Sequence, residues 1–129
     1  YHTALGLQLQ EAQRQFGQAI LIDCHSMPHE AMDSVARSGI RRPDVVLGDR
    51  FGAAAGEQIV DRIEEAFYQA GLVVTRNTPF AGAYVTQHYG RPSKGQHAVQ
   101  IEIDRSLYMD ERTVRPNSRF RSFKKLLDG

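Results

Sequence analysis

Short apolar runs alternate with segments of helical periodicity, and this alternation limits the possible folds more than any other feature of the chain. The runs span residues 19–24, 44–47, 72–75 and 97–104 and are rich in Ile, Val and Leu, as buried strands are. The clearest helix is predicted over 57–70, where apolar residues recur every three or four positions until Gly71. Such alternation predicts an α/β fold with a mixed or mostly parallel sheet and flanking helices.

The remaining segments are less regular. Residues 5–16 show an amphipathic helical pattern that stops at Gly17, and the tail 113–127 is predicted to be helical in its second half. Residues 31–43 are interpreted as a loop or short helix, and 84–89 are ambiguous. The 129 residues suit one domain or part of a larger one. Because the chain starts at Tyr1 within a helical pattern and has no initiating Met, we expect its N-terminal portion to be missing.

Composition disfavours several classes of partner. Lys plus Arg number 16 and Asp plus Glu 15, a balance that gives no attraction to nucleic acid or to an anionic membrane. The basic tail 115–125 is interpreted as a solvated helix face. No apolar run approaches the roughly 20 residues of a membrane helix. Cys24 is the single cysteine, so no internal disulfide can form, which fits a cytoplasmic location.

The first strand ends in a segment that carries candidate metal chemistry. Side chains alternate along a strand, so Asp23 and His25 share one face and Ile22 and Cys24 the other. A His on a rigid strand end suits a metal ligand, and Asp23 could orient its ring. The alternative is an ordinary hydrogen-bonded His. Cys24 is interpreted as a small core residue rather than a nucleophile.

The last strand places polar side chains on one face. Gln100, Glu102 and Asp104 alternate with three apolar residues. On an outer strand this face would meet solvent, whereas on an interior strand the carboxylates would be costly unless they line a site. In that second case Glu102 could serve as a general base.

Loops after the strands supply further candidates. The Gly-, Pro- and aromatic-rich segment 77–84 indicates either a shaped pocket loop or a plain connection. Arg50, Arg76 and Arg105 each follow a strand, and Arg suits bidentate binding of carboxylates, although an ordinary surface Arg is the default. A metal pair formed by His25 and His29 is disfavoured because Pro28 intervenes in a loop-like segment.

Four segments together resemble the N-formylglutamate amidohydrolase family. They are LIDCHSMP (21–28), DVVLGDRFG (44–52), NTPFAGAYVTQHYGRP (77–92) and QIEIDRSLYMDE (100–111), in family order and with family-like spacing. The resemblance implies a zinc hydrolase with a metallocarboxypeptidase-like (phosphorylase/hydrolase-like) fold. It also implies cleavage of N-formyl-L-glutamate to formate and L-glutamate, a last step of one histidine-degradation route.

The resemblance also implies roles for individual residues. His25 matches a zinc (Zn²⁺) ligand and Glu102 the general base, while the other ligands, a His and an acidic residue, are expected in the missing N-terminal part. The chain alone is therefore expected to be inactive. An Arg is expected to clamp the substrate carboxylates. The residues expected in substrate binding are Arg50, Arg76, Asn77, Gly82, Tyr84 and Arg105, and those expected in supporting positions are Asp23, Ser26 and Gln100.

Two other functions remain open. One is hydrolysis of another N-acyl amino acid or small peptide, since Ala83 stands where the family tends to have a second Gly, a change that bears on specificity more than on reaction class. The other is a non-catalytic α/β module. If the N-terminal portion is missing, the sheet of this partial domain has uncovered edges. Such edges predict self-association into a homo-oligomer.

Overall fold

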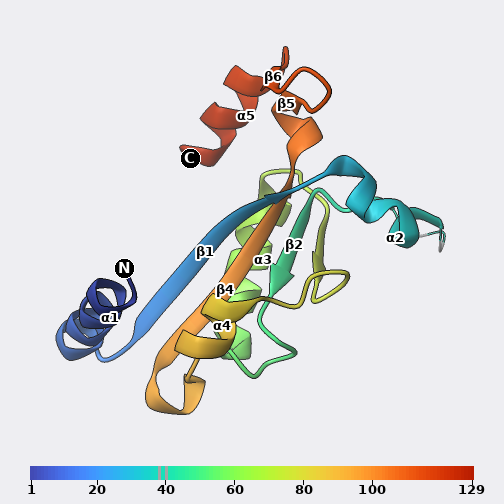
Figure 1. Ribbon diagram of the computed structural model, residues 1–129. Coiled ribbons are helices and arrows are strands. Elements are labelled where there is room, and N and C mark those ends of the chain that lie inside the picture. The colour runs from blue at the N-terminus through green and yellow to red at the C-terminus, as the bar shows by residue number, and fades with distance from the viewer. Residues whose placement is uncertain (38, 40) are drawn as a thin grey trace.

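The computed structural model describes residues 1–37, 39 and 41–129, and these form a twisted mixed sheet with helices on both of its faces (Figure 1). The sheet confirms the predicted α/β class. Within the described residues, no helix is long and apolar enough to cross a membrane.

The four-stranded sheet has the order β1-β4-β2-β3. β1 runs parallel to β4 and β2 parallel to β3, whereas β2 and β4 are antiparallel. β4 is therefore an interior strand, and β1 lies at an edge. The strands are β1 (Ala19–Met27), β2 (Val45–Gly48), β3 (Val74–Arg76) and β4 (Gln96–Asp104), with β5 (Met109–Asp110) and β6 (Arg115–Pro116) forming a separate two-stranded ribbon.

The helices divide between the two faces of the sheet. In Figure 1, α3 lies behind the strands and α4 in front of β4, while α1 lies beside the lower part of β1. α5 stands with the β5–β6 ribbon at the opposite end from α1. The helices are α1 (His2–Phe16), η1 (His29–Met32), α2 (Asp33–Arg37), α3 (Glu57–Gln69), α4 (Tyr84–Tyr89), η2 (Pro92–Lys94), η3 (Arg105–Leu107) and α5 (Phe120–Leu127).

The face covered by α3 carries the largest apolar core. Its buried residues are Val45, Leu47, Ala55, Val60, Val99 and Ile101. The opposite face is apolar at both ends. α1 and α4 cover one end, where Leu9, Ala19, Tyr89 and Ala98 are buried, and at the other end Met27, Met32 and Val46 are buried. A polar stretch of the same face lies between these two clusters. We call it the polar patch, and it consists of Asp23, His25, Gln100 and Glu102.

Local differences from the sequence predictions follow from the position of each element. β1 continues beyond the predicted run 19–24 as far as Met27, because β4 pairs with it along that whole length. The ambiguous segment 84–89 is helix α4. Residues 31–43 contain the end of η1 and α2, and positions 38 and 40 lie outside the described residues. The prediction of Cys24 as a core residue was wrong: it is exposed, because β1 is an edge strand whose outward-facing neighbours Ile20 and Ile22 are also exposed.

Candidate active site

The polar patch is built by the register between β1 and β4. Asp23 pairs with Gln100 and His25 with Glu102, so all four side chains project from the same face of neighbouring strands about 5 Å apart. β4 is interior, and Glu102 is only 8% exposed. The alternative of a solvent-facing outer strand is therefore excluded, and the buried carboxylate calls for a chemical explanation.

His25 and Asp23 form a carboxylate–imidazole pair. The Nε2 atom of His25 lies 3.0 Å from Oδ2 of Asp23, and the His25 side chain is about half exposed while that of Asp23 is mostly covered. A carboxylate that holds one ring nitrogen fixes the ring orientation and leaves the other nitrogen to a ligand. The predicted sharing of a face by these two residues is confirmed.

This pair fits one part of a zinc site. An oriented imidazole is a ligand type that zinc accepts. Within the described residues, however, no three His, Cys, Asp or Glu side chains gather closely enough to hold a metal ion. Since a catalytic zinc site uses three protein ligands, the described residues do not form such a site by themselves.

Gln100 joins Glu102 to the loop that follows β3. Its Nε2 donates a 2.8 Å hydrogen bond to Oε1 of Glu102, and both side chains are buried. Its Oε1 accepts a 2.9 Å hydrogen bond from the backbone N–H of Ala83. One side-chain amide therefore contacts the carboxylate and the loop at the same time.

The loop of residues 77–83 packs directly against the sheet beside the polar patch. A Cβ atom on Gly48, the register partner of Gln100, would lie 2.6 Å from the backbone N of Gly82, so only a glycine permits this approach. At the start of the loop, Asn77 has a left-handed φ of 60°. Its side chain donates to Asp49 Oδ1 at 2.7 Å and accepts from the Asp49 N–H at 3.1 Å.

Arg50 reaches the same loop from the end of β2. Its backbone N–H donates to the carbonyl of Ala81 at 2.8 Å, and its Nη1 donates to the carbonyl of Gly82 at 3.1 Å. Arg50 and its neighbour Phe51 both adopt left-handed φ values, 53° and 56°, which L residues rarely take. Such backbone strain clusters at functional sites and supports a function for this corner of the sheet.

Arg76 lies elsewhere. It pairs in register with Leu47, which belongs to the α3-covered core, and it forms ion pairs with Asp61 and Glu64 of α3. Burial alone would lower the pKa of the Arg76 guanidinium, but hydrogen bonds and charges from the two carboxylates outweigh it and raise that pKa. The structure therefore does not bring Arg76 to the polar patch.

Arg105 and Tyr84 lie at the borders of the site. The Arg105 guanidinium donates to Oγ of Ser26 at 3.0 Å and to its carbonyl at 3.1 Å, close to the carboxyl end of β1. Tyr84 begins α4, just after the loop, and its exposed ring stacks on His88 with 5.1 Å between centroids. The contacts of Arg105 are with Ser26 and Glu111, and the ring of Tyr84 contacts His2 and His88.

One cluster was not predicted from the sequence. His29, which was considered only as a metal ligand, has its Nδ1 2.7 Å from Oδ2 of the buried Asp104 and 3.1 Å from Oγ of Ser106. This cluster fastens η1 to the end of β4. Strand alternation places Asp104 on the same face as Glu102 and so indicates a buried carboxylate. Its partner His29 lies in η1, whose path the sequence does not define.

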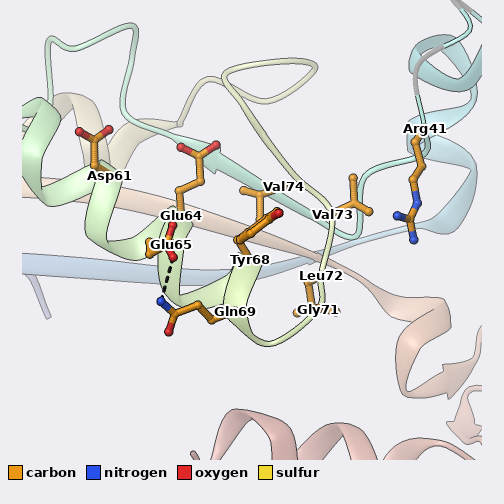
Figure 2. A pocket seen from close by; sticks show the side chains of 10 residues that line it. All are labelled: Arg41, Asp61, Glu64, Glu65, Tyr68, Gln69, Gly71, Leu72, Val73 and Val74. Carbon is orange, nitrogen blue, oxygen red and sulfur yellow. Dashed lines mark hydrogen bonds between the residues drawn. The ribbon is translucent and has the colours of Figure 1, made fainter.

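A cleft of about 1000 Å³ lies away from the polar patch, beside α3 and the β3 edge. Figure 2 shows Asp61, Glu64 and Glu65 projecting from α3 and Arg41 standing across the cleft. Glu65 accepts a 2.8 Å hydrogen bond from Gln69 of the same helix. Asp61 and Glu64 pair with Arg76, and Glu65 pairs with Gln69, so the cleft does not share the chemistry of the polar patch.

The family model described as N-formylglutamate amidohydrolase matches residues 1–109. Two curated relatives, N-formylglutamate deformylases of Pseudomonas putida and Pseudomonas aeruginosa, are 36% and 35% identical to the chain over 116 residues. Each alignment covers 86% of this chain and 41% of the relative, so the chain spans about two-fifths of the length of these enzymes.

A solved structure shows the same fold. The crystal structure of N-formylglutamate amidohydrolase from Ralstonia eutropha JMP134 superimposes with a TM-score of 0.88 at 35% sequence identity. The match covers 98% of this chain and 46% of the other. Every described element of the sheet thus has a close counterpart in less than half of a larger protein.

Proposed function

Since the chain belongs to the N-formylglutamate amidohydrolase family, we propose that it forms part of the active site of a metal-dependent hydrolase that converts N-formyl-L-glutamate to formate and L-glutamate. The observation that carries the proposal is Glu102, a carboxylate buried on an interior strand beside an oriented His25. An active site explains that costly burial, whereas a purely structural sheet would place an apolar residue there.

We propose that the 129 residues are a single domain or the C-terminal portion of one hydrolase domain, within a longer parent protein. The relatives' greater length supports this proposal. The ligand set points the same way, because the polar patch supplies His25 but no complete metal site within the described residues. The remaining zinc ligands would come from the part of the parent protein that precedes Tyr1, and the chain alone would be inactive.

In the complete site, His25 would hold zinc and Asp23 would keep the imidazole oriented. A bound zinc ion would lower the pKa of a water molecule toward about 7 and polarise the formyl carbonyl. The strand register supports these roles, because it pairs His25, near the carboxyl end of β1, with Glu102 of β4.

Glu102 would act as the general base. It would take a proton from the attacking water and deliver it to the nitrogen of the departing L-glutamate, so that the amide bond breaks with a neutral amine as leaving group. Burial and the hydrogen bond from Gln100 hold its carboxylate in one orientation. A positioned base of this kind contributes about 10²- to 10⁴-fold to the rate.

Arg50 is the best supported of the three arginines as the clamp for the substrate carboxylates. It reaches the loop that contacts Gln100, whereas Arg76 is paired with α3 on the opposite face and Arg105 with Ser26. Its guanidinium fork matches a carboxylate in geometry. The loop from Asn77 to Gly82 would form the adjoining wall of the substrate pocket.

We propose a cytoplasmic location from the single cysteine, and a small-molecule substrate without a nucleic-acid or membrane partner from the balanced charge. Zinc as the metal is proposed from the family resemblance, and the imidazole of His25 is a ligand type that zinc accepts.

Product release by the parent protein tests the proposed reaction and its substrate. Formate would be measured from N-formyl-L-glutamate and acetate from N-acetyl-L-glutamate. We expect efficient formate release and much slower acetate release. A preference for the acetyl compound would move the function to another N-acyl amino acid, and turnover of neither would favour the non-catalytic module.

A further inference from the structure

We infer that Gln100 is a positioning residue that couples the loop 77–83 to Glu102. The base is then aligned only while the loop is packed against the sheet and hydrogen-bonded to Gln100. This inference rests on the proposed function for its catalytic consequence. The coupling itself rests on two hydrogen bonds of one buried side chain.

The amide of Gln100 suits this task because its two ends have opposite polarity. The NH₂ group faces Oε1 of Glu102 at 2.8 Å, and the carbonyl oxygen faces the N–H of Ala83 at 2.9 Å. Turning the amide over would set an oxygen against a carboxylate and an NH₂ against an N–H, so the partners fix one orientation. With only 4% of Gln100 and 8% of Glu102 exposed, solvent cannot easily replace the hydrogen bond between them.

The loop side of the link continues to the proposed substrate clamp. Ala83 follows Gly82, whose carbonyl accepts from the Arg50 guanidinium, and Arg50 also donates its N–H to Ala81. The backbone of the loop packs directly against Gly48, so the loop can shift little while these hydrogen bonds stay intact. Arg50, the loop, Gln100 and Glu102 therefore form one continuous set of contacts between the place where substrate carboxylates would bind and the base.

Two substitutions of Gln100 distinguish its hydrogen bond to Ala83 from its hydrogen bond to Glu102. Gln100→Glu keeps an oxygen that accepts from the Ala83 N–H, but it removes the donor to Glu102 and sets a second carboxylate there. Gln100→Leu removes both bonds. Gln87→Leu, the same change at an exposed Gln of α4, is the matched control.

The first measurement is hydrogen–deuterium exchange of the Ala83 amide in the parent protein, which needs no activity. We expect about tenfold faster exchange in Gln100→Leu, the effect of losing one hydrogen bond of average strength, and little change in Gln100→Glu or Gln87→Leu. Unchanged exchange at Ala83 in Gln100→Leu would overturn the link between Gln100 and the loop.

The second measurement is the kinetics of formate release at unchanged metal content. In Gln100→Glu we expect kcat to fall by about 10²-fold with KM within a few-fold of wild type, because misplacing a catalytic group by about 1 Å costs that much while the loop stays seated. A kcat within twofold of wild type in both Gln100 variants would overturn the positioning role. An inactive wild-type protein would instead refute the proposed function, and the coupling would then be decided by the exchange result alone.

Discussion

Glu102 and its neighbours show how single residues define the site. Strand alternation predicts that Asp23 and His25 share one face and that Gln100 joins Glu102 on one face, and the contacts confirm both pairs. Alternation could not predict the partners of Arg76, because these depend on the rotation of α3 about its own axis. The sequence left three arginines equal because the partners of Arg50 and Arg105 are also set by tertiary contacts.

The arginine assignment leads to a prediction at this scale. Replacing Arg50 by Met in the parent protein should raise KM for N-formyl-L-glutamate by about 10- to 100-fold, because a charge-assisted hydrogen bond is worth about 1.5–3 kcal/mol. Arg76→Met is the control and should leave KM within a few-fold, since its partners are Asp61 and Glu64 of α3. Steady-state kinetics of both variants measures the difference, and the reverse order would transfer the clamp to Arg76.

At the scale of elements, the site depends on how the loop 77–83 meets the sheet. The sequence predicted the four strands of the main sheet and the helices α1, α3 and α5 in the right order, and it predicted a Gly- and Pro-rich loop at this position. It could not predict that Gly82 rests directly on Gly48, because that contact joins residues 34 positions apart through tertiary packing. α4 was ambiguous for a related reason: a six-residue helix has too few turns to show a period.

Gly48→Ala tests this packing. Its Cβ would lie 2.6 Å from the N of Gly82 and 2.7 Å from the carbonyl carbon of Ala81, so the loop must move away from Gln100. We expect the free energy of unfolding of the parent protein to fall by about 1–3 kcal/mol, as for other overpacking substitutions, together with a loss of formate release.

The same substitution in an open position supplies the control. In α1, a Cβ on Gly6 would have nothing within 4 Å, so Gly6→Ala should raise the free energy of unfolding by about 0.5–1 kcal/mol through helix propensity alone. Urea denaturation gives both values. A Gly48→Ala protein as stable and active as wild type would show that the loop does not need its observed contact with Gly48.

At the scale of the whole molecule, β1 is an edge strand that exposes apolar side chains. Its nine residues pair with β4 on one side, and Ile20 and Ile22 are 44% and 39% exposed on the face opposite the polar patch. An exposed apolar edge strand is a template for pairing with another chain. The sequence predicted uncovered edges from the incomplete resemblance, but the order that puts β1 outermost required the observed pairing.

We therefore predict that the 129-residue chain by itself self-associates at micromolar concentration. Ile22→Lys should shift it toward the monomer, because a charge on an edge strand opposes pairing. Leu7→Lys, at an exposed apolar position of α1, should leave the association unchanged. Sedimentation velocity measures all three chains, and a folded, monomeric wild-type chain would contradict the prediction.

The central claim is that the polar patch holds the base of an amide hydrolase, and one comparison tests it most directly. Zinc content and formate release from N-formyl-L-glutamate would be measured for the parent protein, for Glu102→Gln, and for Glu65→Gln, the same change at an exposed position of α3. We predict that all three retain about one zinc per chain, and that Glu102→Gln alone loses at least about 10²-fold in formate release. Formate release by Glu102→Gln at the rate of the Glu65→Gln control would contradict the account.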